Sequence, residues 1–325
     1  MRICVYGAGA VGGLIAAWLH RSGHEVSVVA RGAHLEAMRA GGLRVRSGNE
    51  VQTFRLRAES DPARLGPQDY VLVVVKAQSL TGVAQGIAPL LGKDTSIVTA
   101  MNGVPWWFFD RLGFKKGVER LESLDPGGVL ARAMPTERIV GGVIHLAASM
   151  PEPGLISHNM GRKLILGEPG GKNSARTVRI AEALSGAGFE VLVSEFIEKD
   201  FWVKLLGNVS FNPVSALTVS TADRLIEDRE IKRYMVEIMR EVLAIGRAVG
   251  VDADIDPEAR IEMARVLGPF KTSMLQDLEA GKPLEVDGLL AGTLEVARKA
   301  GVRAPFTESL FGLIRARASA TGQYR

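Results

Sequence analysis

A glycine-rich stretch near the N-terminus constrains the fold more than any other feature of the chain. Residues 2–6 (RICVY) have the pattern of a short buried strand, and the segment GAGAVGG follows at once, with Gly7, Gly9 and Gly12 in the spacing G-x-G-x-x-G. An apolar helix and a second strand come next. Here the first glycine permits a tight turn, the second lets a pyrophosphate approach the backbone, and the third lets helix and strand pack closely. The pattern predicts a dinucleotide-binding α/β domain, and a purely structural glycine turn is the alternative.

The phosphates of such a cofactor bind to free backbone N–H groups where the helix begins. We therefore expect the residues of the turn to form the cofactor site, namely Gly7, Ala8, Gly9, Ala10, Val11 and Gly12.

The end of the second strand distinguishes between the two nicotinamide dinucleotides. An NAD site usually has an Asp or Glu there, which accepts a hydrogen bond from the ribose 2′-hydroxyl. This chain has Arg31 instead, and no carboxylate occurs before Glu36. Because arginine can pair with a 2′-phosphate, the sequence favours NADPH; a solvated surface arginine is the alternative.

Two further polar residues follow expected strands. Residues 70–75 (YVLVVV) have the pattern of a central parallel strand, and Lys76 stands at its end. Asn102 follows the next strand pattern, 96–100. Ligands of open α/β sheets bind beyond the carboxyl ends of the strands, so we expect both residues near the cofactor, although loop residues in water would look the same.

The segment 199–217 (KDFWVKLLGNVSFNPVSAL) carries a second group of polar residues. Lys204, Asn208 and Asn212 are four residues apart and would line one face of a helix. One ammonium and two amides can hold a polar substrate, whereas an ordinary amphipathic helix is the alternative. Pro213 predicts a kink or break after Asn212.

The patterns change along the chain. Strands recur up to Val193, and only helical patterns follow from Glu195 onward. The predicted fold class is therefore α/β, with an NADP-binding Rossmann domain over 1–194 and an all-helical substrate and catalytic domain over 195–325. The aromatic cluster 106–109 is interpreted as core or a subunit contact rather than a substrate wall, and 117–135 as a loop.

Composition excludes several classes of protein. The single cysteine, Cys4, excludes an intrachain disulfide framework and fits a reducing compartment, so we expect a cytoplasmic protein. A strand pattern at Arg2 leaves no room for a signal peptide, and no window of eighteen apolar residues predicts a membrane span. The net charge of +4 is spread along the chain and no nucleic-acid motif is present. His145 and His158 lack metal-ligand spacing, so no metal is expected.

Taken together, these motifs resemble the ketopantoate reductase (2-dehydropantoate 2-reductase) family over essentially the whole chain. The resemblance rests on GAGAVG, Arg31, VVVK at 73–76, Asn102-Gly103, K-x3-N-x3-N-P at 204–213, SMLQD at 273–277 and E-x-D at 285–287. It implies NADPH-dependent reduction of the 2-oxo acid 2-dehydropantoate to pantoate, a step of pantothenate and coenzyme A biosynthesis.

The resemblance also implies roles for individual residues. Lys204 would be the catalytic general acid, and Glu285 would act with it near the substrate hydroxyl and the nicotinamide ribose. Asn208 and Asn212 would hold the substrate, and Ser273 with the following turn would bind its carboxylate. Asn102 would face both substrate and cofactor, and Lys76 and the Ala147 backbone would contact the cofactor.

Alternatives come from positions where the sequence departs from the family pattern. Leu284, Leu290, Ala291 and Ala222 stand where polar or small residues are common, which would fit the same chemistry on a more apolar 2-oxo acid. A non-catalytic NADPH-binding regulator is the alternative from another class. The last helices are apolar enough for a homodimer contact, but also for a core.

Overall fold

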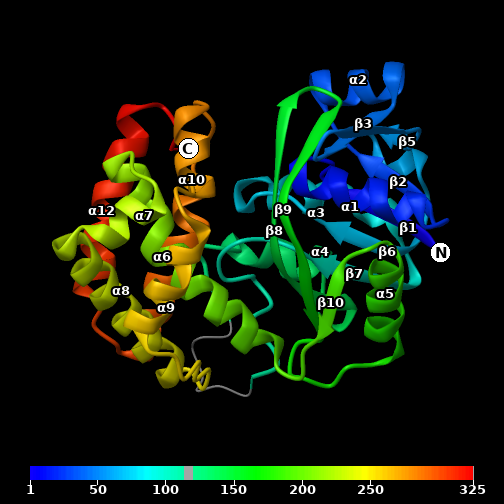
Figure 1. Cartoon of the computed structure of the whole chain (residues 1–325). Helices are drawn as coiled ribbons and strands as arrows, with labels where there is room; N and C mark the ends of the chain where they lie inside the picture. Colours follow the sequence, from blue (N-terminus) through cyan, green and yellow to red (C-terminus); the bar gives the residue numbers. More distant parts are fainter. Residues whose placement is uncertain (113–119, 325) are drawn as a thin grey trace. The chain divides into compact units, whose positions relative to one another are not determined.

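The computed structural model describes residues 1–112 and 120–324, which form two compact units. Unit 1 comprises Met1–Met101 and Val129–Ile197, and unit 2 comprises Asn102–Gly128 and Glu198–Arg325 (Figure 1). Residues 102–128, which the division at residue 194 assigned to the first domain, thus belong to unit 2. Of the expected loop over 117–135, residues 117–119 lie outside the described part, and the stretch beyond them contains the helical turns η4 (Pro126–Gly128) and α4 (Val129–Ala133).

Unit 1 is the α/β part of the chain and contains every strand among the described residues. Its strands are β1 (Arg2–Tyr6), β2 (Glu25–Val29), β3 (Leu43–Ser47), β4 (Glu50–Phe54), β5 (Arg57–Glu59), β6 (Gln68–Val73), β7 (Leu91–Thr99), β8 (Ile139–Glu152), β9 (Leu155–Gly167) and β10 (Glu190–Val193). Its helices are α1 (Ala10–Arg21), α2 (Gly32–Gly41), α3 (Leu80–Gly86), α4 (Val129–Ala133) and α5 (Ala175–Gly186), with short 3₁₀ turns η1 (Pro62–Arg64), η2 (Ala77–Ser79), η3 (Ala88–Leu90) and η5 (Thr136–Arg138).

The strands form one ten-stranded sheet that curls on itself. The strand order is β4-β3-β9-β8-β7-β6-β1-β2-β5, with β10 paired to β9. β4 and β5 stand at opposite ends of this order, yet only Arg55 and Leu56 separate them in the chain. Because two residues span only about 10 Å even when extended, the two ends of the sheet must lie close together.

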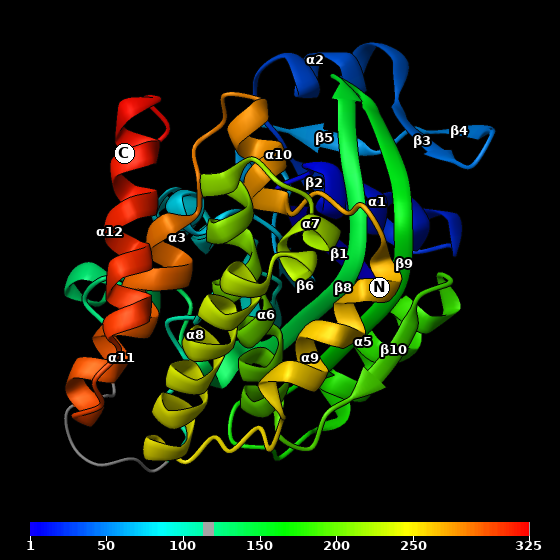
Figure 2. The same ribbon diagram turned by 60° about the vertical axis from the view of Figure 1, so that its left-hand side comes forward.

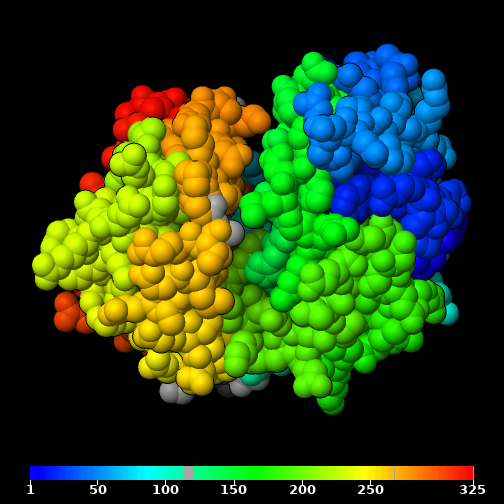
Figure 3. Space-filling view, viewed as in Figure 1, coloured from blue at the N-terminus to red at the C-terminus, as the bar shows by residue number. Residues whose placement is uncertain are grey.

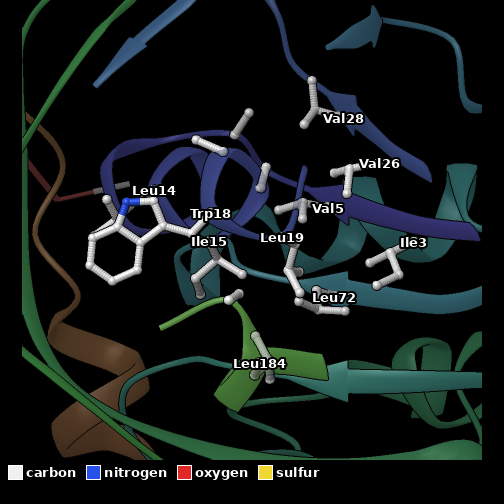
Figure 4. Packing of buried hydrophobic residues seen from close by; sticks show 14 of the residues in the cluster. Ile3, Val5, Leu14, Ile15, Trp18, Leu19, Val26, Val28, Leu72 and Leu184 are labelled. Atoms are coloured by element: carbon white, nitrogen blue, oxygen red, sulfur yellow. The ribbon is translucent and has the colours of Figure 1, made fainter. Parts of the chain in front are cut away.

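Helix α1 occupies the inside of this curl. All of its residues from Gly12 to Leu19 are buried, and it contacts strands toward both ends of the sheet: β1, β2, β3, β4, β8 and β9. Figure 4 shows Leu14 and Leu19 among side chains of these strands. A helix that is apolar on all sides is stable only when it is enclosed, which explains the unbroken run LIAAWL. Figure 3 shows only part of the N-terminal segment (dark blue) at the surface, beside the light-blue atoms of the segment that follows it.

β3 and β4 form an antiparallel hairpin, and β8 pairs antiparallel with β9. The sequence pattern suggests separate strands at 154–158 and 163–166, but 155–158 and 163–166 belong to one long strand, β9. β8 pairs with one edge of β9. Two strands pair with the other edge: β3 near Ile156 and β10 near Leu164.

Unit 2 is helical, which completes the predicted fold class. Beyond the turn η4 (Pro126–Gly128), its elements are α6 (Ile197–Thr218), α7 (Ala222–Glu227), α8 (Arg229–Ala248), α9 (Pro257–Ala264), η6 (Arg265–Leu267), α10 (Ser273–Glu279), the π-helical turn η7 (Asp287–Ala291), α11 (Gly292–Ala300) and α12 (Pro305–Ala320). Figure 2 shows the long helices α6, α8 and α12 of this unit.

Of the kink or break predicted at Pro213, the break is wrong, because α6 continues through this residue to Thr218. The missing N–H removes one hydrogen bond of the helix. Burial compensates for this loss, because Val209, Val214 and Ala216 are all nearly inaccessible. Tertiary packing thus holds a helix that the local sequence disfavours.

The aromatic cluster 106–109 belongs to the core of unit 2. Trp107 packs edge-on against Phe201 with ring centroids 5.3 Å apart, and Phe108 lies 5.6 Å from Trp202. The Nε1–H of Trp202 donates to the carbonyl of Val242 at 3.0 Å. These contacts fix the segment after Asn102 against α6.

Candidate active site

The glycine-rich turn between β1 and α1 has the geometry that its sequence predicts. Gly7 has φ +103°, and a Cβ added there would lie 2.6 Å from the carbonyl oxygen of Val74. A Cβ at Gly12 would lie 2.1 Å from the carbonyl oxygen of Gly7. A side chain at either position would collide with the backbone. Packing within the protein therefore explains why the first and third residues of the motif are glycine.

Gly9 differs from the other two glycines. It is the N-cap of α1, no side chain caps the helix there, and a Cβ at this position would meet nothing within 4 Å. No described protein contact therefore requires this glycine. A phosphate that approaches the helix N-terminus does require it, so the turn fits a dinucleotide.

His34 of α2 supports this turn. Its Nδ1 accepts a hydrogen bond from the N–H of Gly154 at 2.9 Å, so its Nε2 carries the proton and donates to the carbonyl of Ala8 at 2.7 Å. Burial lowers the pKa of His34, while the bond to Ala8 raises it. The neutral ring thus links the turn to α2 and to the β8–β9 connection.

Arg31 stands just beyond β2, at the N-cap of α2, and is exposed. Its guanidinium is near the hydroxyl of Tyr6, the last residue of β1. Burial raises the pKa of Tyr6, and the charge of Arg31 partly offsets this increase. A Cβ at Gly82 would lie 3.8 Å from Nη2 of Arg31. The cation is therefore at the carboxyl ends of β1 and β2, where the sequence places the 2′-phosphate.

Lys76 and Ala147 are also in unit 1. Lys76 is the N-cap of η2, three residues beyond β6, and β6 pairs directly with β1. It therefore follows a strand adjacent to the glycine turn. Ala147 lies in β8 at a register irregularity opposite Met160. A bulge leaves backbone groups outside the ladder, which is compatible with the expected backbone contact.

Unit 2 brings four of the predicted residues together. Asn102 Nδ2 donates to Glu285 Oε2 at 3.3 Å, and Asn208 Nδ2 donates to Asn102 Oδ1 at 3.5 Å. Lys204, one helical turn before Asn208 on α6, is close enough to Glu285 for their charges to interact. Residues that are more than 100 positions apart in the chain thus form one polar cluster, which we call the lysine cluster.

The state of Lys204 suits proton transfer. Burial lowers its pKa to about 8, although the nearby carboxylate of Glu285 acts to raise it. Lys204 makes no hydrogen bond or ion pair with any described residue. Its ammonium group therefore remains protonated near neutral pH and has donors available for a ligand.

Two predicted substrate residues do not join the lysine cluster. Asn212 is buried on α6 and its side chain makes no hydrogen bond to the described residues. Ser273 is exposed at the first position of α10, and the preceding Thr272, not Ser273, caps that helix by accepting from the N–H of Leu275 at 3.2 Å. A capping role for Ser273 is thereby excluded.

Two searches of the described residues gave no candidate. None of their helices is long and apolar enough to cross a membrane. No group of three or more His, Cys, Asp or Glu side chains among them is arranged to hold a metal ion.

A curled Rossmann sheet with a phosphate-binding turn, together with a helical unit that carries a lysine of lowered pKa, defines the class of dinucleotide-dependent oxidoreductases. The model of the family described as ketopantoate reductase PanE/ApbA matches residues 3–171, and that of its C-terminal part matches residues 197–318. The chain belongs to the ketopantoate reductase family.

Individual relatives agree with this assignment. A 2-dehydropantoate 2-reductase of Mesorhizobium japonicum is 42% identical, with 100% of both chains covered. The crystal structure of a candidate ketopantoate reductase from Ralstonia solanacearum MolK2 superposes with a TM-score of 0.95 at 46% identity, covering 99% of each chain. A 2-dehydropantoate 2-reductase structure from Geobacter metallireducens GS-15 gives a TM-score of 0.86 at 29% identity, covering 98% of this chain and 100% of that one.

Proposed function

We propose that this chain reduces 2-dehydropantoate to pantoate with NADPH, as a cytoplasmic enzyme of pantothenate and coenzyme A biosynthesis. The observation that carries the proposal is the lysine cluster, in which an ammonium of lowered pKa, without a hydrogen bond to the described residues, is grouped with a carboxylate and two amides. Binding of a dinucleotide alone would require none of these groups. The family membership and the full-length similarity to 2-dehydropantoate 2-reductases agree with it.

The residues of unit 1 would bind the cofactor. The N–H groups at the start of α1 would hold the pyrophosphate, and Arg31 would pair with the 2′-phosphate of NADPH. Lys76 and the Ala147 backbone would line the nicotinamide side. When bound, NADPH supplies a hydride from C4 of its nicotinamide ring. No metal takes part in this proposal.

The residues of unit 2 would act on the substrate. As the C2 ketone accepts the hydride, negative charge develops on its oxygen, and the Lys204 ammonium stabilises this charge and then donates the proton. The products are the 2-hydroxy acid, NADP⁺ and neutral Lys204, which takes up a proton from solvent. Glu285 would hold the substrate hydroxyl, and Asn102, Asn208, Asn212 and Ser273 would orient the rest of the molecule.

The alternative of a more apolar substrate rests on four positions. Ala222, Leu284 and Leu290 are buried in unit 2, so packing accounts for their apolar side chains without a change of substrate. Ala291 is partly exposed, and the substrate panel below tests the alternative.

The experiment that tests the proposal follows absorbance at 340 nm with NADPH and a panel of 2-oxo acids. We expect the highest kcat/KM with 2-dehydropantoate. Turnover of other 2-oxo acids but not of 2-dehydropantoate would support the different-substrate alternative. Absence of NADPH oxidation with every acid, together with NADPH binding, would identify a non-catalytic regulator and refute the proposal.

A further inference from the structure

Gln323, which follows helix α12, is a buried polar residue whose side chain binds the end of another helix. The residue is only 4% exposed, and its Nε2 group donates to three backbone carbonyls: Asp277 at 3.0 Å, Leu278 at 3.3 Å and Lys282 at 2.7 Å. Asp277 and Leu278 are in the last turn of α10, where carbonyls have no partner within the helix. The amide therefore joins the end of α10 to the segment that follows it.

The backbone of Gln323 contacts the same segment, next to Glu285. Its carbonyl oxygen accepts from the N–H of Leu284 at 3.0 Å, and its own N–H donates to the carbonyl of Ala318 at 2.7 Å. Ala318 is buried within α12. Through Gln323, α12 thus holds the residue immediately before Glu285.

Tyr324 holds the chain on the other side of Glu285. Its hydroxyl donates to Oδ1 of Asp287 at 2.9 Å, and Asp287 is the first residue of η7. Residues 280–285 belong to no helix or strand, so their position depends on contacts of this kind. Glu285 therefore lies between two residues, Leu284 and Asp287, that are both bound by the end of the α12 segment.

Glu285 is the carboxylate of the lysine cluster. It accepts from Asn102 at 3.3 Å, and its charge interacts with that of Lys204. Interactions between charges weaken with distance, so a shift of the segment 280–285 would change the surroundings of the proton donor.

We propose that Gln323 is a positioning residue, which fixes Glu285 in its place within the lysine cluster. Tyr324 contributes to the same role through Asp287. The inference rests on the proposed function, in which Glu285 holds the substrate hydroxyl. Catalysis is sensitive to such placement, because an error of about 1 Å can cost on the order of 10²-fold in rate.

A double-mutant cycle tests whether Gln323 acts through Glu285. Gln323→Leu removes the amide and keeps roughly the same size, and we expect kcat with NADPH and 2-dehydropantoate to fall about tenfold. In a Glu285→Ala background the same substitution should cost less than about twofold, because the carboxylate to be positioned is already absent. Equal losses in the two backgrounds would overturn the inference.

Thr307→Val is the matched control on the same helix. Thr307 is fully buried on α12, and its hydroxyl donates to Glu241 of α8 at 2.7 Å. This variant also loses a hydrogen bond of α12, but kcat should stay unchanged at a temperature where it is folded. A fall in kcat equal to that of Gln323→Leu would show a general effect of α12 and overturn the inference.

Tyr324→Phe keeps the test decisive if Gln323→Leu does not fold. It removes a single hydroxyl from a partly exposed residue, and kcat should fall in the same direction by a smaller factor. An unchanged kcat in this variant, with Gln323→Leu unfolded, would refute the positioning role.

A titration of Lys204 separates this inference from the proposed function, because it needs neither substrate nor turnover. The carboxylate of Glu285 acts to raise the pKa of Lys204, which is about 8, so displacement of Glu285 should lower this pKa further. NMR of protein with ¹³C-labelled lysine gives the value, and Lys204→Met identifies the signal.

The two proposals then fail in different ways. A lowered pKa of Lys204 in Gln323→Leu but not in Thr307→Val, in a wild type without reductase activity, would refute the reaction but support the positioning role. The same Lys204 titration in wild type and Gln323→Leu would refute the positioning role, whatever the activity.

Discussion

The backbones of Gly103 and Gly288 are so close that a Cβ added at Gly103 would lie 2.0 Å from the carbonyl oxygen of Gly288. Gly103 also has φ +84°, which side chains rarely allow. This contact joins the residue after Asn102 to the π-helical turn that follows Glu285. It therefore sets the 3.3 Å hydrogen bond between Asn102 and Glu285.

Gly103→Ala should disturb the lysine cluster. The added methyl group must displace the π-helical turn, so we expect a loss of roughly 3 kcal/mol or more in the free energy of unfolding and a fall in kcat. Gly301→Ala is the control, because Gly301 has φ +70° but open space around it. It should lose only about 1–2 kcal/mol, measured by urea denaturation. Equal losses in the two variants would contradict the steric explanation.

Turnover should depend on the protonation of Lys204. Because its pKa is about 8, kcat should be constant below this pH and fall about tenfold per unit above it, as the ammonium loses the proton it donates. Lys204→Met should lower kcat by at least about 10²-fold while NADPH still binds. A flat profile to pH 10, measured by stopped-flow so that chemistry is seen, would exclude Lys204 as the acid.

The same lysine should reduce stability. Its pKa of about 8 in the folded protein is below the ordinary lysine value of 10.5, so the native state binds the proton less tightly than the unfolded state. The charge therefore destabilises the protein below pH 8, and this effect disappears as the pH rises from about 8 to 10.5. Lys204→Met should raise the free energy of unfolding by on the order of 1–3 kcal/mol at pH 7.

Urea denaturation of both proteins at pH 7 and pH 10 tests this expectation, because effects of other groups cancel in the difference. The advantage of the variant should shrink at the higher pH. A constant advantage would mean that lost packing or shape, rather than charge, distinguishes the two proteins.

Arg31 should determine the preference for NADPH. Arg31→Glu should weaken NADPH binding at least about tenfold, because a charge-assisted pair with the 2′-phosphate is replaced by repulsion. NADH binding should change little. Fluorescence titration gives both dissociation constants, and Arg55→Glu, an exposed site between β4 and β5, controls for net charge. Equal weakening of both cofactors would show that Arg31 does not contact the 2′-phosphate.

Cys4 should be unreactive in the native protein. It is buried in β1, and burial raises the pKa of its thiol to about 12, although Ser27 acts to lower it. Because the thiolate is the reactive species, Ellman's reagent at pH 8 should detect no thiol in the folded protein and one after denaturation. Rapid reaction of the native protein would show that β1 opens easily.

The turn and the strand ends were predictable because their chemistry is local. Gly7 and Gly12 are required by contacts a few residues away, and Arg31 follows from the end of one strand. The helix through Pro213 was not predictable, because long-range packing overrides the local preference there. His34 carries no local signal, since its partner Gly154 is distant in the chain.

The placement of 102–128 was missed for a similar reason. The aromatic residues of this segment indicate that it is buried. Only the contacts of Trp107 and Phe108 with α6 show that it belongs to the hydrophobic core of unit 2. The bond from Asn102 to Glu285 likewise spans 183 positions. Periodicity within one segment carries no information about such pairs.

Enclosure of α1 within the curled sheet has a consequence for loss of the cofactor. Helix α1, whose N-terminus we propose as the phosphate site, contacts strands from both ends of the strand order, so it cannot separate from the sheet while those ends stay together. Local fraying at an edge strand would leave the phosphate cradle intact. The nucleotide-binding competence of unit 1 should therefore vanish in the same cooperative transition as its tertiary structure, without an intermediate that is folded but unable to bind.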